Sequence, residues 1–233
     1  MKKIVFATGN SNKVREIREI FKDSDTEIIS LKEAGIPSDA VENGDTFADN
    51  AVIKAKAASG YTDMIVMADD SGLVIDALGG EPGIYSARYM GEDTSYRIKN
   101  AELIKRLEGV PAEKRTARFV CAIAALLPDG TTHIFEGKIE GRIGYGEAGE
   151  GGFGYDPIFF IPKEEAVKAL MNIGISKENA IEKADAYAAQ AIAAGASYKE
   201  MSGWISTAQL PPEAKNSISH RGRALFEARK GLK

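Results

Sequence analysis

The sequence has little cysteine and little histidine. Cys121 is the only cysteine among 233 residues, and there are only two histidines. A disulfide within the chain is therefore excluded, and so are metal sites built from Cys and His. Cys121 stands in the apolar run 119–123, so we expect it to be a small core residue rather than a nucleophile.

Long apolar runs and an excess of positive charge are also missing. No run approaches the roughly 18 to 20 apolar residues that cross a bilayer, and no apolar signal region follows Met1-Lys2-Lys3, so we expect a cytoplasmic protein. The formal net charge is −4, with acids and bases mixed along the chain, which argues against non-specific nucleic-acid binding. The 44% of hydrophobic residues suffices for one large domain or two small ones.

Two adjacent acids follow the apolar run 64–68. This run predicts a buried strand, and Asp69-Asp70-Ser71-Gly72 predicts a tight turn at its end. Neighbouring carboxylates raise one another's pKa or need a cation, and ligands bind at the carboxyl ends of strands in open α/β sheets. The pattern favours a divalent metal site, with a solvated Asx-turn as the alternative.

The start of the chain has a phosphate-binding layout. A strand over 3–7 precedes the turn Thr8-Gly9-Asn10-Ser11-Asn12, and a helix is expected from about Lys13. Backbone N–H groups at a helix start and a lysine ammonium both attract an anion. The spacing is not that of a Walker loop, so an ordinary capped β–α turn is the alternative.

Two candidate residues lie close to a predicted helix start. Thr46 and Asp49 have capping-box spacing and predict a helix over 47–59, with Glu42 on the loop before it and Lys54 one turn into it; either side chain could face a ligand or solvent. Strands are expected over 118–127 and 131–143, joined as an antiparallel hairpin by the turn at 128–130.

Six glycines in the eleven residues 144–154 imply a mobile loop or a closely approached backbone. The loop ends in Phe153-Gly154-Tyr155-Asp156, whose aromatics and carboxylate suit a heterocyclic base, with packing against the core as the alternative. Near the C-terminal end, His220 and Arg221 are expected in the first turn of the last helix. Cations there oppose the helix dipole, which suggests that they and Lys215 face a ligand phosphate or base.

Together these motifs resemble the Ham1/RdgB (inosine triphosphate pyrophosphatase) family. The resemblance covers residues 2–162 and about 206–226, in the order of the family. Its motifs are Thr8-Gly9-Asn10 with Lys13 and Glu16, Asn50-Ala51 with Lys54, Ala68 to Leu73, Gly83 to Tyr89, Gly152 to Pro157, and Ser219 to Gly222.

The resemblance implies a fold and an activity. The implied α/β fold is elongated and two-lobed, with a central twisted mixed sheet flanked by helices and a cleft between the lobes. The implied protein is a homodimer that hydrolyses ITP, dITP and XTP to the monophosphate and pyrophosphate, by Mg²⁺-dependent attack of water on the α-phosphorus, and so cleanses the nucleotide pool.

The resemblance also implies roles for single residues. Thr8 to Lys13 contact the triphosphate, and Lys54 supports them. Mg²⁺ is held by Glu42, Asp69 and Asp70. Asp70 also activates water, and Ser71 touches the substrate. For the base, Phe153 to Asp156 form a cradle, Lys215 lies beside it, and His220 and Arg221 recognise the 6-oxo group.

One segment departs from the family pattern. Residues 163 to about 205 stand where the pattern has a short loop, and their spacing predicts an inserted hairpin of two or three helices, with a last capping box at 197–200. We expect this segment to cap the cleft or to make a protein contact, with a solvated decoration as the alternative.

Two other functions remain open. A Maf-type nucleotide pyrophosphatase would act on other bases, and the segments at 153–156 and 219–221 argue against it. A catalytically silent nucleotide-binding module is opposed by Lys13, Glu42, Asp69 and Asp70, which are all present.

Overall fold

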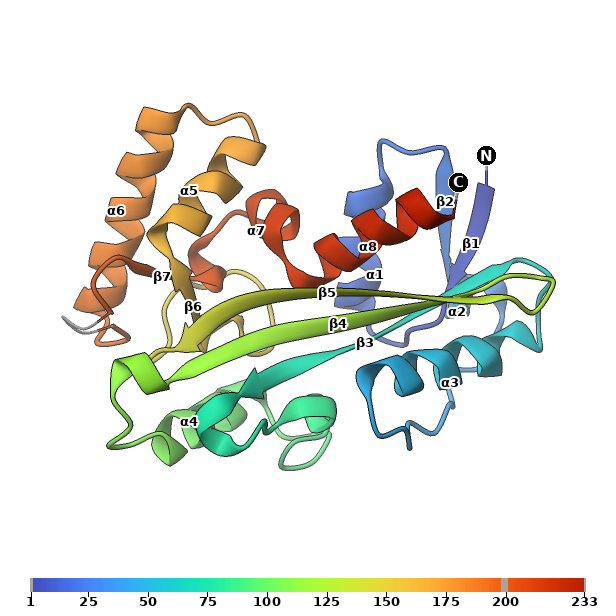
Figure 1. Ribbon diagram of the computed structural model, residues 1–233, viewed down its shortest axis with the longest axis horizontal. Helices are drawn as coiled ribbons and strands as arrows, with labels where there is room; N and C mark the ends of the chain where they lie inside the picture. The colour runs from blue at the N-terminus through green and yellow to red at the C-terminus, as the bar shows by residue number, and fades with distance from the viewer. Residues whose placement is uncertain (1, 198–200, 233) are drawn as a thin grey trace. The chain divides into compact units, whose positions relative to one another are not determined.

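The computed structural model describes residues 2–197 and 201–232, which form two compact units. Unit 1 comprises Met1–Ser71, Val120–Lys138 and His220–Lys233, and unit 2 comprises Gly72–Phe119 and Ile139–Ser219. Seven strands form one mixed sheet in the order β2-β1-β3-β4-β5-β6-β7. The predicted α/β fold with a mixed sheet and flanking helices is confirmed (Figure 1).

The strands and helices have the following bounds. The strands are β1 (Lys2–Phe6), β2 (Thr26–Ser30), β3 (Ile65–Ile75), β4 (Thr116–Leu126), β5 (Thr132–Ile143), β6 (Phe159–Pro162) and β7 (Trp204–Ser206). The helices are α1 (Ser11–Phe21), α2 (Leu31–Ala34), α3 (Phe47–Ser59), α4 (Tyr96–Arg106), α5 (Lys163–Asn172), α6 (Lys177–Ala193), α7 (Pro212–Ile218) and α8 (His220–Gly231). Among the described residues, no helix is long and apolar enough to cross a bilayer.

Unit 1 is a sheet with helices on both faces. β1 pairs in parallel with both β2 and β3. Because side chains alternate along a strand, Ile4 and Phe6 pack with α1 and α8, whereas Val5 and Ala7 pack with α2 and α3. In Figure 1, α1 and α8 lie above β3 and α3 lies below it.

The predicted tight turn at 69–72 is wrong. β3 runs without a break from Ile65 to Ile75, so both acids lie inside an extended strand. Successive side chains of a strand point to opposite faces, and Asp69 accordingly contacts α1 and α8 while Asp70 contacts α3. Each carboxylate is paired with a cation, so the strand can continue through them into the core.

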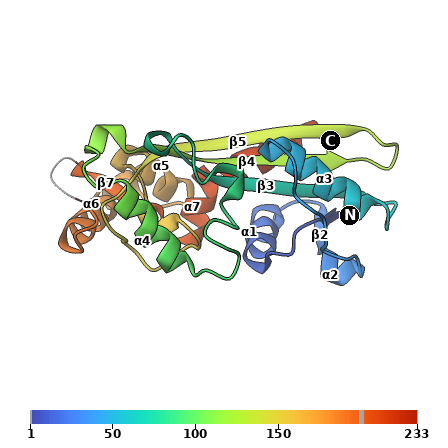
Figure 2. The ribbon, with the colours of Figure 1, turned by 90° about the horizontal axis from the view of Figure 1, so that it is seen from below.

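Unit 2 has antiparallel strands and a helix layer on each side. Arg142 of β5 pairs with Phe160 of β6, and Phe160 pairs with Ser206 of β7. α4 lies on one side of these strands, and α5, α6 and α7 lie on the other (Figures 1 and 2). The predicted hairpin of β4 and β5 is present, since the strands are neighbours joined by the turn at 127–131.

The segment at 163–205 contains the two predicted helices, α5 and α6. An alanine stripe on α6 packs with α5 in the main core of unit 2; its members are Ala180, Ala184 and Ala188. The helices connect β6 to its sheet neighbour β7. Residues 198–200 of the predicted capping box lie outside the described residues, and the insertion of this segment relative to the family stays a prediction.

Candidate functional site

Asp69 lies between two cations on one face of β3. Its Oδ2 is 2.9 Å from Lys13 Nζ of α1 and accepts hydrogen bonds of 3.2 Å from Nε and Nη2 of Arg221 on α8. Burial alone would raise the pKa of Asp69, but Lys13, Arg221 and Lys54 outweigh it and hold this pKa well below its usual range. These cations therefore favour the ionised form of Asp69.

Arg221 is buried and makes contacts in three directions. Besides Asp69, it forms an ion pair with Glu16 of α1 and donates a hydrogen bond of 3.0 Å to Ser71 Oγ. Burial alone would lower the pKa of Arg221, but Asp69 and Glu16 outweigh burial and hold this pKa above its ordinary value. Sequence reasoning assigned no role to Glu16. The available signal was its i,i+3 spacing from Lys13, which puts both side chains on one face of α1.

Asp70 faces α3 on the opposite side of the strand. Its Oδ1 is 3.3 Å from Lys54 Nζ, its Oδ2 accepts a hydrogen bond of 3.2 Å from Asn50 Nδ2, and Lys54 also lies 3.2 Å from Glu42. Burial raises the pKa of Asp70 above its usual value despite Lys54 and Lys13. Burial lowers the pKa of Lys54, but Asp69, Asp70 and Glu42 raise it above the ordinary lysine value.

The predicted phosphate turn begins α1 and borders a cavity. Asn10 Oδ1 caps the helix by accepting hydrogen bonds from the amides of Asn12 and Lys13, at 2.9 and 3.3 Å. Thr8, Gly9 and Ser11 line a cavity of about 960 Å³. Four cations also line it: Arg15, Arg18, Lys22 and Lys32. The turn is thus next to a mainly basic surface of unit 1.

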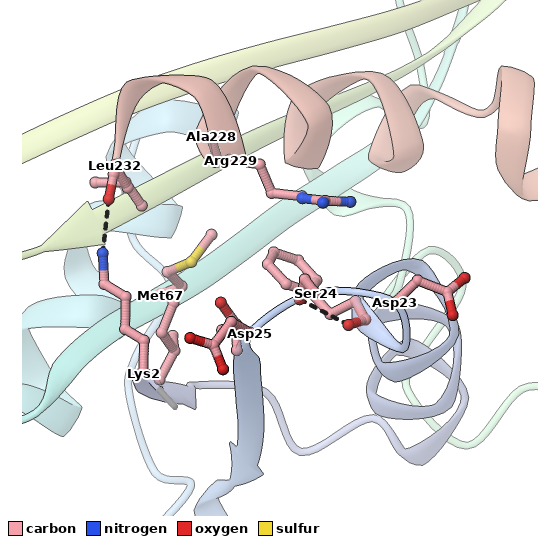
Figure 3. A pocket seen from close by; sticks show the side chains of 11 residues that line it. Lys2, Asp23, Ser24, Asp25, Met67, Ala228, Arg229 and Leu232 are labelled. Carbon is pink, nitrogen blue, oxygen red and sulfur yellow. Dashed lines mark hydrogen bonds between the residues drawn. The ribbon is translucent and has the colours of Figure 1, made fainter.

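A second cavity of unit 1 contains no predicted site residue. It has a volume of about 530 Å³ and lies beside the end of α8, β1 and the turn after α1 (Figure 3). Lys2 Nζ donates a hydrogen bond to the carbonyl of Leu232 across it. Acids and bases line it together: Asp23, Asp25, Lys2 and Arg229. The structure connects this cavity with none of the predicted roles.

In unit 2, Asp156 holds the predicted base-binding segment together. Its Oδ2 accepts hydrogen bonds from Lys215 Nζ at 2.7 Å and from the amide of Phe153 at 2.8 Å, and its Oδ1 accepts one from Thr207 Oγ1 at 3.2 Å. The ammonium of Lys215 lies 4.7 Å from the centre of the Phe153 ring. Sequence reasoning missed Thr207, because nothing near it in the chain signals this contact.

Tyr155 packs into the core of unit 2. Its hydroxyl donates a hydrogen bond of 2.7 Å to the carbonyl of Ser86, its ring meets that of Tyr96 edge-on at 5.1 Å, and burial raises its pKa. Phe153 and Gly154 are the half-buried members of the segment. The glycine-rich loop also shows the expected close approach of backbones: a Cβ on Gly149 would lie 2.4 Å from the backbone of Ala208.

The structure gathers most predicted residues into three groups. Two groups are in unit 1, Lys13, Asp69, Ser71 and Arg221, and Glu42, Lys54 and Asp70; the third, in unit 2, is Phe153, Asp156 and Lys215. His220 begins α8 and is buried. Within residues 2–197 and 201–232, no three His, Cys, Asp or Glu side chains lie close enough to hold a metal ion by themselves.

Comparison with known proteins assigns the family. The model of the Ham1 family matches residues 4–194. This chain belongs to the Ham1 family. The dITP/XTP pyrophosphatase of Geobacillus kaustophilus is 42% identical over 225 residues, which cover 97% of this chain and 91% of that protein. The dITP/XTP pyrophosphatase of Desulforamulus reducens is 42% identical over 226 residues, or 97% and 93% of the two chains.

Solved Ham1 structures share the fold. A HAM1 protein from Coxiella burnetii superposes with a TM-score of 0.75 at 33% identity, covering 100% of this chain and 98% of that one. The Ham1 protein of Staphylococcus aureus gives a TM-score of 0.73 at 35% identity, covering 99% and 98%. Family membership therefore extends over nearly the whole chain.

Proposed function

We propose that this protein hydrolyses non-canonical purine nucleoside triphosphates, dITP, ITP and XTP, to the monophosphate and pyrophosphate. The observation that carries the proposal is the pair of acids on β3: Asp69 and Asp70 are adjacent, and their surroundings move their pKa values in opposite directions. Such a divergence separates a fixed charge from a proton acceptor. Relatives named dITP/XTP pyrophosphatases supply the substrate class.

The cations of unit 1 are the proposed triphosphate ligands. Lys13 and Lys54 each hold a carboxylate within 3.3 Å, so in this state their charge neutralises the acids. A triphosphate would compete for the same ammonium groups and would meet the amides of the Thr8–Asn12 turn. Fixed cations and amides around a polyanion stabilise the charge that develops on the leaving pyrophosphate.

Asp70 is the proposed acceptor of the proton of the attacking water. A general base works best when its pKa lies near the operating pH, and burial raises the pKa of Asp70 in that direction. Asn50 fixes one of its oxygens from α3. Asp69 stays ionised in this scheme, and it orients Lys13 and Arg221.

The carboxylates of unit 1 are suited to Mg²⁺. Glu42 and Asp70 already converge on one cation, the ammonium of Lys54. Mg²⁺ commonly takes one or two carboxylates, with substrate phosphates and waters as its other ligands. Glu42 and Asp70 would hold the ion, which would neutralise phosphate charge; Asp69 faces the other side of β3.

The aromatic segment of unit 2 is the proposed site for the base. Phe153 is half-buried, and the ammonium of Lys215 lies over its ring. The resemblance adds His220 and Arg221 as donors to the 6-oxo group. Hypoxanthine and xanthine present an acceptor at that position and an N1–H, whereas adenine presents an amino group, so donors fixed there would reject ATP.

Three further features of the proposal come from the resemblance and from the sequence. We expect a homodimer and a cytoplasmic location, and we expect the segment at 163–205 to cap the site or to contribute to a protein contact. Sedimentation equilibrium of the full chain, and of a chain in which a short linker replaces this segment, tests the first and last points. An unchanged mass and unchanged KM and kcat would refute a role for the segment.

Pyrophosphate release distinguishes the candidate functions. We expect release from ITP in the presence of Mg²⁺, little from GTP or dTTP, and loss of activity in Asp70→Asn. Preferential turnover of dTTP would instead support a Maf-type enzyme. Tight binding of ITP without turnover would support a catalytically silent module and refute the proposal.

A further inference from the structure

Asn100 on α4 ties the glycine-rich loop of unit 2 to the helix. The residue is 1% exposed. Its Nδ2 donates hydrogen bonds to Glu147 Oε1 at 2.8 Å and to the carbonyl of Gly154 at 3.4 Å. These two acceptors come 47 and 54 residues later in the chain, and both belong to the loop at 144–154.

Among residues 2–197 and 201–232, the other end of the same amide has no partner. Asn100 Oδ1 is buried and accepts no hydrogen bond from the described residues. A buried acceptor without a donor costs about 1–3 kcal/mol of stability. The hydrogen bonds of this side chain are therefore made by Nδ2 alone, and both of them reach the loop. This combination points to a role in function rather than in stability.

Backbone contacts and the side chain of Arg115, which donates to the carbonyl of Gly144, hold other parts of the loop. The amide of Gly151 donates to the carbonyl of Ala208 at 2.9 Å, and the amide of Ala148 donates to the carbonyl of Pro157 at 3.0 Å. At the tip of the loop, residues 153–154, the amide of Phe153 donates a hydrogen bond to Asp156 Oδ2. Asn100 supplies a side-chain contact to the tip from outside the loop.

Tyr96, one helical turn before Asn100 on α4, also contacts the tip of the loop. Residues four apart lie on one face of a helix, so Tyr96 and Asn100 are neighbours on α4. A Cβ on Gly154 would lie 3.5 Å from a Tyr96 ring carbon, so this ring packs directly against the tip. Gly154 has φ +68°, a conformation that favours glycine, and its carbonyl direction is set by these contacts.

We propose that Asn100 is a positioning residue for base recognition: it fixes the tip at 153–154 at the distance and angle at which the Phe153 ring meets the purine. This inference rests on the proposed function, since it needs the base to bind at Phe153. Loss of the Nδ2 contacts would loosen substrate binding and leave the chemistry at Asp70 intact.

Asn100→Leu tests the inference in the full-length protein. We expect KM for ITP to rise by about 5- to 10-fold, kcat to stay within about twofold, and the midpoint of thermal unfolding to stay equal or to rise, because the unpartnered oxygen is gone. Thr116→Val is the control: it removes another side-chain hydrogen bond of unit 2, from Thr116 Oγ1 to Asp76, and should leave KM unchanged.

Glu147 gives a second test that does not depend on a core substitution. Glu147 is exposed, so Glu147→Ala should fold normally while it removes one acceptor of Asn100 Nδ2. We expect KM to rise about 2- to 5-fold, and Glu147→Gln, which keeps an acceptor oxygen, to restore it.

The outcomes separate the two claims. The role of Asn100 is overturned if KM is unchanged in both Asn100→Leu and Glu147→Ala. It is also overturned if kcat falls as much as KM rises and the unfolding midpoint is lower. In either case, turnover of ITP by the wild-type protein upholds the proposed function. If the wild-type protein does not turn over ITP, the proposed function itself fails.

Discussion

The acid clusters of unit 1 and the aromatic loop of unit 2 are built on different physical principles. In unit 1, charges from β3, α1, α3 and α8 neutralise one another, and each predicted phosphate-binding lysine already holds a carboxylate. In unit 2, one carboxylate, Asp156, is satisfied by an ammonium, an amide and a hydroxyl. Unit 1 can exchange partners when an anion arrives, whereas unit 2 presents a fixed shape.

The largest expected effect is on turnover and comes from unit 1. Asp70→Asn keeps the volume of the side chain and an oxygen for Asn50 but removes the proton acceptor. We expect kcat for ITP to fall by about 10²- to 10⁴-fold, the usual contribution of a general base. Asp129→Asn, in the exposed turn between β4 and β5, is the matched control. A fall of less than tenfold in kcat would remove Asp70 from the proposed mechanism.

The same substitution at two buried cations sharpens the contrast between the units. Arg221→Met leaves Glu16 and Asp69 buried without their shared partner, and we expect the free energy of unfolding to fall by about 3–5 kcal/mol. Lys215→Met leaves Asp156 with two other donors, so its loss should be smaller. Urea unfolding of both variants measures the difference. Equal losses would show that the two ion pairs are held in the same way.

The sequence predicted the regular elements of both units better than the site of either. Thr46 marks the start of α3, because its hydroxyl accepts a hydrogen bond from the amide of Asp49 as the capping pattern predicts. The turn at 69–72 was predicted from a local pattern, an apolar run followed by two acids, a serine and a glycine. The cations that allow a strand there come from positions 13, 54 and 221, and no local pattern reveals them.

Long-range side-chain contacts account for the other residues that the sequence did not single out. Thr207 lies 51 residues from the Asp156 carboxylate that it contacts, and Asn100 lies 47 from Glu147. Ordinary residue types at such separations give no signal in one sequence. The predicted site residues, by contrast, were found from acids, lysines and glycines at unusual positions in the sequence. Many of them lie together in the three groups described above, two in unit 1 and one in unit 2.

The opposite pKa directions of the two acids predict opposite pH slopes in the metal-free protein. The pKa of Asp69 is lowered by folding, so its contribution to stability is present above about pH 4, the ordinary Asp value, and is lost as the pH falls below it. The pKa of Asp70 is raised, so its contribution is full below about pH 4 and is lost as the pH rises through the folded value.

Urea unfolding in chelator between pH 2.5 and 7 measures both slopes. Asp69→Asn should flatten the fall in stability on the acid side, and Asp70→Asn should remove the decline with rising pH above about pH 4. The wild-type protein should show both slopes. The same change of slope in the two variants would contradict separate surroundings for the two carboxylates.

The smallest expected effect is at the hydroxyl that completes the partners of Asp156. Thr207→Val keeps the shape of the side chain and removes one hydrogen bond to a carboxylate that retains Lys215 and the Phe153 amide. We expect a loss of about 1 kcal/mol, which corresponds to an unfolding midpoint about 2–4 °C lower, with kcat unchanged. Because the tip of the loop is also held by Asn100, KM for ITP should rise less than in Asn100→Leu. A KM effect larger than that of Asn100→Leu would mean that Asp156, rather than α4, sets the position of the Phe153 ring.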